Sequence, residues 1–140
     1  MKKSISIIAV VLVLFSLCAC GVANLLKGSL ENAEINLDTQ NYFSEADIEE
    51  ALKVVEKKFS SWPGFVMHSI EVSYAGDDTE YCNSLGDGVE FDEAITFTSS
   101  FTTGPEDWSG FSANQTCSGW QWYLARETGG EWQLLTWGYC

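Results

Sequence analysis

The sequence has few basic residues and only one histidine. Seven Lys and Arg stand against 20 Asp and Glu among 140 residues, so the formal net charge is −13. A chain this acidic is repelled by nucleic acid and by anionic lipid, and we expect no nucleic-acid partner. The acidic excess keeps a small domain soluble. It would attract positively charged partners, either basic peptides or a cation.

The motifs of common catalytic sites are also missing. The sequence contains no P-loop, G-x-G-x-x-G, H-E-x-x-H or G-x-S-x-G pattern. Cys82, Cys117 and Cys140 lack the C-x-x-C or Cys-His spacing of zinc sites, and the acidic cluster at 87–93 lacks the order of an EF-hand loop. We therefore expect no catalytic residues, no metal and no cofactor. An enzyme would have to use His68 together with an acidic residue.

One apolar run stands near the start of the chain, from Ile5 to Leu17. It is too short for an ordinary membrane-spanning helix. The pair Lys2-Lys3 precedes it and a small residue precedes Cys20, which is the order of charge, apolar core and small residue that a signal peptidase requires. The sequence therefore predicts a signal peptide over residues 1–19.

The stretch Leu17-Cys18-Ala19-Cys20 resembles the lipobox of bacterial lipoproteins, except that Cys18 stands where Ala, Ser, Thr or Val is usual. The resemblance implies that Cys20 carries lipid and holds the protein at the extracytoplasmic face of the cell membrane. Two or three acyl chains would give stable attachment, because each buried CH₂ contributes about 0.8 kcal/mol. An ordinary secretory signal and an uncleaved anchor helix are the alternatives.

The rest of the chain is long enough for one domain. We expect residues 20–41 to form the lipidated N-terminus and a tether, although the leucines suggest that part of it docks on the domain or forms a short helix. The domain is expected over 42–140, and the six Trp, eight Phe and five Tyr of the chain can build its core. Loss of residues 1–19 removes two of seven basic residues, which leaves five against 20 acidic ones and a formal charge of −15.

Hydrophobic periodicity predicts one long helix at the start of this domain. Ser44 can cap the helix, with Asp47 in the acidic position of a capping box. After this cap, apolar residues recur at three- and four-residue spacing on one face: Ile48, Ala51, Leu52, Val55, Phe59 and Trp62. Pro63-Gly64 ends the helix.

The remaining pattern predicts strands. Alternation over 66–74 places Val66, Ile70, Val72 and Tyr74 on the buried side of a first strand, and a second follows over 94–102. A short helix is expected over 78–85, a long loop over 103–118 and a C-terminal β-hairpin after it. The predicted fold class is α+β, with one long N-terminal helix packed on a twisted antiparallel sheet of about four strands.

The turn Glu127-Thr128-Gly129-Gly130 determines the register of the hairpin. A two- or four-residue turn pairs Arg126 with Glu131, Ala125 with Trp132 and Trp120 with Trp137, whereas a three-residue turn with a bulge shifts the pairing by one residue. The first register also sets Cys117 opposite Cys140. Their Cβ atoms would lie about 4.5–5.5 Å apart, close to what a disulfide requires, so we prefer this pairing. Free thiols and a pairing through Cys82 are the alternatives.

Aromatic side chains fall on both faces of the predicted hairpin. One face is expected to carry Trp120, Trp122, Trp137 and Tyr139, and the other Tyr123, Trp132 and Leu134. One helix cannot cover both faces, so the first set is the candidate ligand site, on which a sugar ring could stack or a peptide could lie. The alternative is that the tether and the loop over 103–118 cover these rings.

The closing segment carries Trp120-Gln121-Trp122, Gly129-Gly130-Glu131-Trp132 and Thr136-Trp137-Gly138-Tyr139. It resembles small lipoproteins of Gram-positive, Firmicutes-type bacteria, whose order of elements is similar to NTF2-like and cystatin-like α+β domains. The resemblance implies a fold more than an activity, because NTF2-like domains include enzymes, ligand-binding pockets and interaction modules. We expect a membrane-anchored, non-catalytic binding module with a protein or cell-wall glycan partner. A carbohydrate- or peptidoglycan-binding domain and an NTF2-like enzyme are the alternatives.

Overall fold

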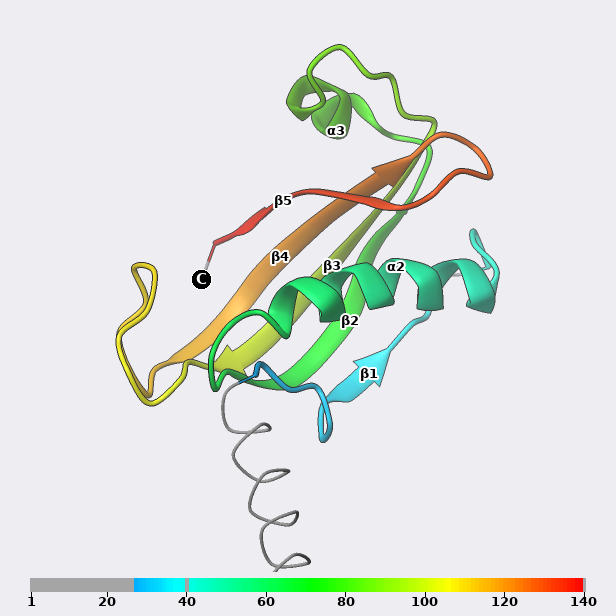
Figure 1. Cartoon of the computed structure of the whole chain (residues 1–140). Helices are drawn as coiled ribbons and strands as arrows, with labels where there is room; N and C mark the ends of the chain where they lie inside the picture. The colour runs from blue at the N-terminus through cyan, green and yellow to red at the C-terminus, as the bar shows by residue number, and fades with distance from the viewer. Residues whose placement is uncertain (1–26, 40, 140) are drawn as a thin grey trace, which may run out of the picture.

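The computed structural model describes residues 27–39 and 41–139 (Figure 1). The expected lipidation site Cys20 and the expected disulfide partner Cys140 lie outside these residues. The fold is α+β, as predicted: helix α2 (Glu45–Phe59) lies across one face of a sheet, and the short helix α3 (Glu80–Leu85) lies at one end of it. No helix within 27–39 or 41–139 is long and apolar enough to cross a membrane.

The sheet has five strands in the order β1-β2-β3-β4-β5, one more than predicted. Strands β2 (Val66–Gly76), β3 (Glu93–Thr102), β4 (Thr116–Arg126) and β5 (Gln133–Gly138) form an antiparallel meander. The additional strand, β1 (Glu34–Asn36), pairs parallel with β2, so the sheet is mixed rather than antiparallel. A three-residue strand carries too little alternation to be recognised in the sequence.

Strand β1 lies in the stretch that we expected to be a tether. Just before it, Ser29 bridges to β2: its N–H donates to the Phe65 carbonyl at 2.9 Å, and its carbonyl accepts from the Met67 N–H at 2.9 Å. Leu30, Ala33 and Leu37 pack against the core. The part of the stretch from residue 27 onward therefore docks on the domain.

Helix α2 begins and faces the core as the sequence predicts. The Ser44 hydroxyl accepts a hydrogen bond from the Asp47 N–H at 3.2 Å and donates one to the Asp47 carboxylate at 2.5 Å. The buried residues of the helix are Ile48, Ala51, Val55 and Phe59. Leu52 is only half-buried at the margin of this face.

The alternation predicted for β2 is confirmed for Ile70 and Val72 and is wrong at both ends of the strand, because two bulges interrupt it. The register against β3 shifts between Met67 and Ser69 and again between Val72 and Tyr74. Each bulge reverses the side to which the following residues point. Met67 is therefore buried in the core, whereas Val66 and Tyr74 are exposed.

Strand β3 alternates without interruption and defines the two faces of the sheet. Ile95, Phe97 and Phe101 belong to the main core beneath α2. Residues Thr96, Thr98 and Ser100, which alternate with them, point to the opposite face, which we call the outer face. A second, smaller apolar cluster lies on the outer face beneath α3 and contains Cys82, Phe91, Ala94 and Ala125 with Leu135 against it.

The preferred hairpin register, which pairs Arg126 with Glu131, is wrong, and next to the turn the pairing is shifted by one residue, as in the alternative register. Trp122 pairs with Trp137, and nearer the turn Leu124 pairs with Leu134, so the pairing is shifted from the expected one along the whole hairpin. A bulge between these two pairs adds a further residue on β5. Arg126 consequently is not paired with Glu131 in the β4–β5 register, and it forms ion pairs with Asp47 and Glu93 instead.

Candidate ligand-binding site

Trp62 is the centre of an aromatic cluster at the C-terminal end of α2. The backbone N–H of Trp62 donates to the Phe59 carbonyl at 2.9 Å. This bond continues the last turn of the helix and points the indole at the sheet. Trp62 stacks on Trp122 with ring centroids 5.3 Å apart and planes at 29°. It also contacts the rings of Phe59, Phe65, Phe101, Trp108, Phe111 and Trp120.

The loop between β3 and β4 completes this cluster. Trp108 and Phe111 exchange two backbone hydrogen bonds of 2.9 and 2.8 Å around Ser109 and Gly110. Both central residues have positive φ, 46° and 89°, which is the conformation of a tight hairpin turn and suits Gly at the second position. The turn brings both aromatic side chains back onto Trp62.

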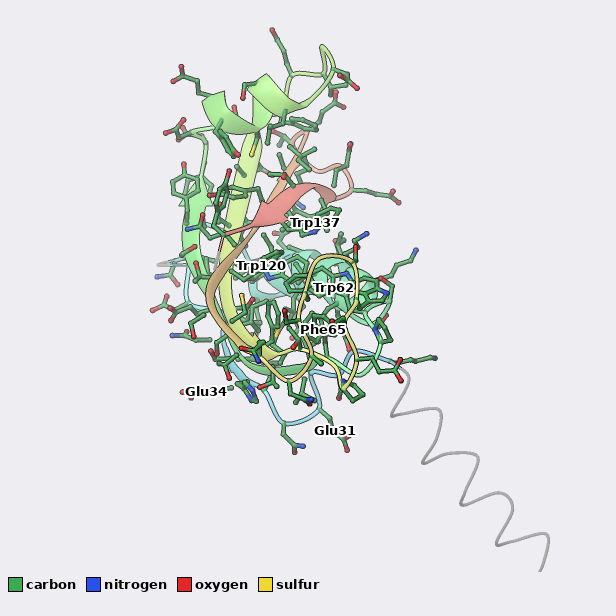
Figure 2. All side chains as sticks on the ribbon, turned by 90° about the vertical axis from the view of Figure 1, so that its left-hand side faces the viewer. Glu31, Glu34, Trp62, Phe65, Trp120 and Trp137 are labelled. Carbon is green, nitrogen blue, oxygen red and sulfur yellow. The ribbon has the colours of Figure 1, made fainter. Side chains whose placement is uncertain are left out.

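A groove of about 400 Å³ opens where this loop, α2 and the last two strands meet. We call it the tryptophan groove. It is lined by Lys58, Trp62, Trp108, Ser109, Gly110, Phe111, Trp120 and Trp137. Figure 2 shows Trp62, Trp120 and Trp137 gathered together beside the loop. Its volume lies in the range of small-ligand sites.

Trp137 is the accessible ring of the groove. Its side chain belongs to edge strand β5, and 37% of the residue is exposed. The Lys58 ammonium lies 4.4 Å from its ring centroid, a cation–π contact that ties β5 to α2. The groove therefore combines a wet aromatic surface with one positive charge.

The four predicted ligand residues do not all line one site. Trp120 and Trp137 line the groove, but Trp122 is fully buried beneath it and its indole N–H donates to the Ser99 hydroxyl at 2.9 Å. The face predicted for Tyr139 is wrong: its hydroxyl lies near Tyr81 and Tyr123 on the outer face, where it raises the pKa of both. Gly138 and Tyr139 both have positive φ, 156° and 72°, so the alternation of β5 ends there.

The sequence predicts Trp132 and Leu134 on the face opposite Trp137. This prediction is wrong because the pairing of β4 with β5 is shifted from the expected register. Trp132 is buried in the main core, where its indole N–H donates to the Asp47 carbonyl at 3.0 Å. Leu134 packs against the same core. Of the three residues expected on the second face, only Tyr123 lies on the outer face.

Sequence reasoning missed six of the eight groove residues, namely Lys58, Trp62, Trp108, Ser109, Gly110 and Phe111. The pattern Trp-Ser-Gly-Phe at 108–111 contains the turn signal, but a turn does not show which surface it folds onto. The groove also contains an unsatisfied polar group: the buried indole N–H of Trp120 has no hydrogen-bond acceptor among the described residues.

A second cavity, of about 410 Å³, lies on the outer face between α3 and strands β2, β3 and β4. We call it the tyrosine cavity. Tyr74, Tyr81 and Tyr123 line it together with the polar residues Asp78, Thr96 and Gln121. It is separated from the tryptophan groove by the thickness of the sheet.

The cysteines are divided between the two faces. Cys117, opposite Phe101 on the core side of β4, is disulfide-bonded, and Cys82 on α3 is a free, buried thiol. A bridge through Cys82 is therefore wrong. The expected partner Cys140 lies outside the described residues, so the pairing of Cys117 with Cys140 stays a prediction.

His68 lies away from both cavities. It is exposed, and its Nε2 atom lies 2.6 Å from the Thr102 hydroxyl, while no carboxylate of the described residues is hydrogen-bonded to it. Within 27–39 and 41–139 no group of three or more His, Cys, Asp or Glu side chains is placed to hold a metal ion.

Comparisons with protein-family models, with curated proteins and with solved structures found no match. The site must therefore be interpreted from its own geometry.

Proposed function

We propose that the protein is a lipid-anchored, non-catalytic binding module of the extracytoplasmic membrane face, and that its tryptophan groove binds a cell-wall glycan. The observation that carries the proposal is the row of Trp62, Trp108, Trp120 and Trp137 along one open groove, with the ring of Trp137 partly exposed. Flat aromatic rings offer a large apolar area to the apolar face of a sugar at low cost in conformational entropy.

The polar residues of the groove suit a ligand with many hydroxyl groups. Lys58 and Ser109 supply hydrogen-bond donors at its rim, while the ring faces supply the floor. The acidic charge of the rest of the domain limits binding of strongly anionic chains, so a neutral or weakly charged glycan fits best.

An NTF2-like enzyme is less well supported. Its chemistry would require His68 beside a carboxylate in a cavity, whereas His68 is exposed and contacts Thr102. We propose that this chain shares with NTF2-like and cystatin-like domains the order of elements but not an enzymatic activity. In that order, one long helix precedes an antiparallel meander and lies across it.

Glycan binding is tested with the lipidated protein in non-ionic detergent and with insoluble cell-wall sacculi. Trp137→Ala should lower the affinity for sacculi about fivefold, because one stacked ring contributes about 1 kcal/mol. The matched control is Tyr81→Ala, which removes a comparably exposed ring on the outer face and should bind like wild type. Equal binding by wild type and Trp137→Ala, or no binding by either, would contradict the glycan proposal and favour a protein partner.

Anchoring is tested separately by replacing Cys20 with Ala. The variant should leave the detergent phase when cells are extracted and partitioned, because the acyl chains are lost. Cys82→Ala makes the same chemical change at the buried thiol of α3 and should remain in the detergent phase. Continued membrane attachment of Cys20→Ala would count against the lipoprotein proposal without bearing on the groove.

A further inference from the structure

The tyrosine cavity differs from the tryptophan groove in its charge. Asp78 is the only charged residue among those described as lining it, and no Lys, Arg or His is among them. Lys53, Lys57 and Lys58 lie on α2, across the sheet, and Arg126 is occupied by ion pairs. The cavity therefore combines aromatic rings with a negative field.

Two of the three tyrosine hydroxyls are hydrogen-bonded to protein groups. The Tyr123 hydroxyl donates to the Gln121 side-chain carbonyl, and the Tyr139 hydroxyl lies close enough to Tyr81 to raise the pKa of Tyr81. The Tyr74 hydroxyl accepts from the Asp78 N–H at 2.8 Å. The rings rather than the hydroxyls are therefore the free surfaces of this cavity.

The rings are held in fixed positions around the space. Tyr81 and Tyr123 pack edge to face, with centroids 4.9 Å apart and planes at 63°. Tyr74 lies against Gly76, where a Cβ atom would come within 2.4 Å of the Tyr74 hydroxyl oxygen, so any other residue at position 76 would require this ring to shift. The Asp78 carboxylate is within 3.4 Å of the Glu80 N–H at the start of α3.

Tyr81, Tyr123 and the Cys82 thiol remain neutral at physiological pH, because their surroundings raise the pKa of each group. Desolvation first, and then the neighbouring hydroxyls of Tyr139 and Tyr123, raise the pKa of Tyr81. Desolvation and the Asp78 carboxylate raise the pKa of the Cys82 thiol. The ring faces thus keep the negative electrostatic potential of neutral phenols, beside one fixed carboxylate.

We propose that the tyrosine cavity binds a quaternary ammonium group of the choline type, which the rings of Tyr74, Tyr81 and Tyr123 hold by cation–π contacts while the Asp78 carboxylate balances its charge. A quaternary ammonium suits the site because it has no N–H donors, so the ring faces and the Asp78 carboxylate can hold it without hydrogen bonds to the tyrosine hydroxyls. Anions are excluded, since no described cation lines the space. This site is independent of the tryptophan groove.

The test uses the full lipidated protein in non-ionic detergent and follows the N-methyl proton signal of choline by NMR. Ring currents should shift the bound signal upfield, and the neutral isostere 3,3-dimethyl-1-butanol should bind at least about tenfold more weakly. Tyr81→Ala and Asp78→Asn should each lower choline affinity by about five- to tenfold. Tyr81→Phe, which keeps the ring, should retain most of the affinity.

Trp137→Ala is the matched control on the other face and should bind choline like wild type. The quaternary ammonium could belong to a free solute or to a head group attached through a phosphodiester, and phosphocholine separates these two sources. If phosphocholine binds more weakly than choline, the ligand is a free solute. If it binds as tightly as choline, the ligand is a head group carried on a phosphodiester. Equal binding of choline and its neutral isostere, no shift with choline or phosphocholine, or loss of binding only in Trp137→Ala would overturn the proposal.

Discussion

Arg126 donates a 3.0 Å hydrogen bond from Nη1 to the Asp47 carboxylate, and so joins the last hairpin to the first turn of α2 across 79 positions of sequence. The same guanidinium donates from Nε to Glu93 at 2.6 Å and lies 4.4 Å from the ring centroid of Trp132. Asp47 in turn also pairs with the Ser44 hydroxyl. Helix cap, sheet and hairpin therefore meet at one ionic cluster.

Replacing Arg126 with Met should destabilise the fold. It leaves the Asp47 and Glu93 carboxylates without the cation that balances their charge, while their side chains are only 33% and 19% exposed. We expect a loss of about 2–4 kcal/mol in the free energy of unfolding, below the full range for a deeply buried pair because both carboxylates reach water. Urea denaturation measures it, with the exposed Lys53→Met as control. A loss as small as that of the control would mean that the cluster contributes little.

The Ser44 hydroxyl first, and then the Arg126 guanidinium, lower the pKa of Asp47 below its ordinary value. A carboxyl with a lowered pKa contributes stability that is fully present above the unfolded pKa, about 3.9, and is lost as the pH falls through the lower folded value. Asp47→Asn should thus be less stable than wild type at pH 7, and the difference should shrink below about pH 4. Asp87→Asn, at an exposed turn, is the control. A pH-independent difference for Asp47→Asn would show that its charge is not responsible.

Trp120 and Trp122 form a matched pair for testing core against groove. Trp122→Phe removes the bond to Ser99 and leaves a cavity in the main core, so we expect a loss of about 1–3 kcal/mol. Trp120→Phe removes an N–H that has no acceptor among the described residues, and its cost should stay below about 1 kcal/mol. Thermal unfolding of both variants decides the question. The reverse order of stabilities would place Trp120 in the core instead.

The cysteines can be assigned by chemistry. Mass spectrometry of a non-reduced digest should contain a peptide pair that links Cys117 to Cys140. Cys82 is buried and burial raises its pKa, so an alkylating reagent should modify it slowly in the native protein and rapidly in urea. A linked peptide that contains Cys82, or three free thiols under air, would contradict this assignment.

Local signals in the sequence determined the class of the fold and the start of its main helix. Ser44 and Asp47 cap α2, and the spacing of Ile48, Val55 and Phe59 places one face against the sheet. The turn and helix signals around α3 and the alternation of β3 were equally local. Each depends on residues a few positions apart, so the sequence alone was sufficient to predict them.

Tertiary structure alone decided which residues share a surface. The bulges in β2 and β5 reverse the faces of Met67 and Leu134, and only the pairing with neighbouring strands reveals them. Strand β1 forms because the edge of β2 is available to it, not because of its own three residues. The tryptophan groove requires α2, the β3–β4 loop and β5 together, and the tyrosine cavity requires α3 and three strands. The physical reason is that register and packing depend on contacts between residues far apart in the chain, which local periodicity does not encode.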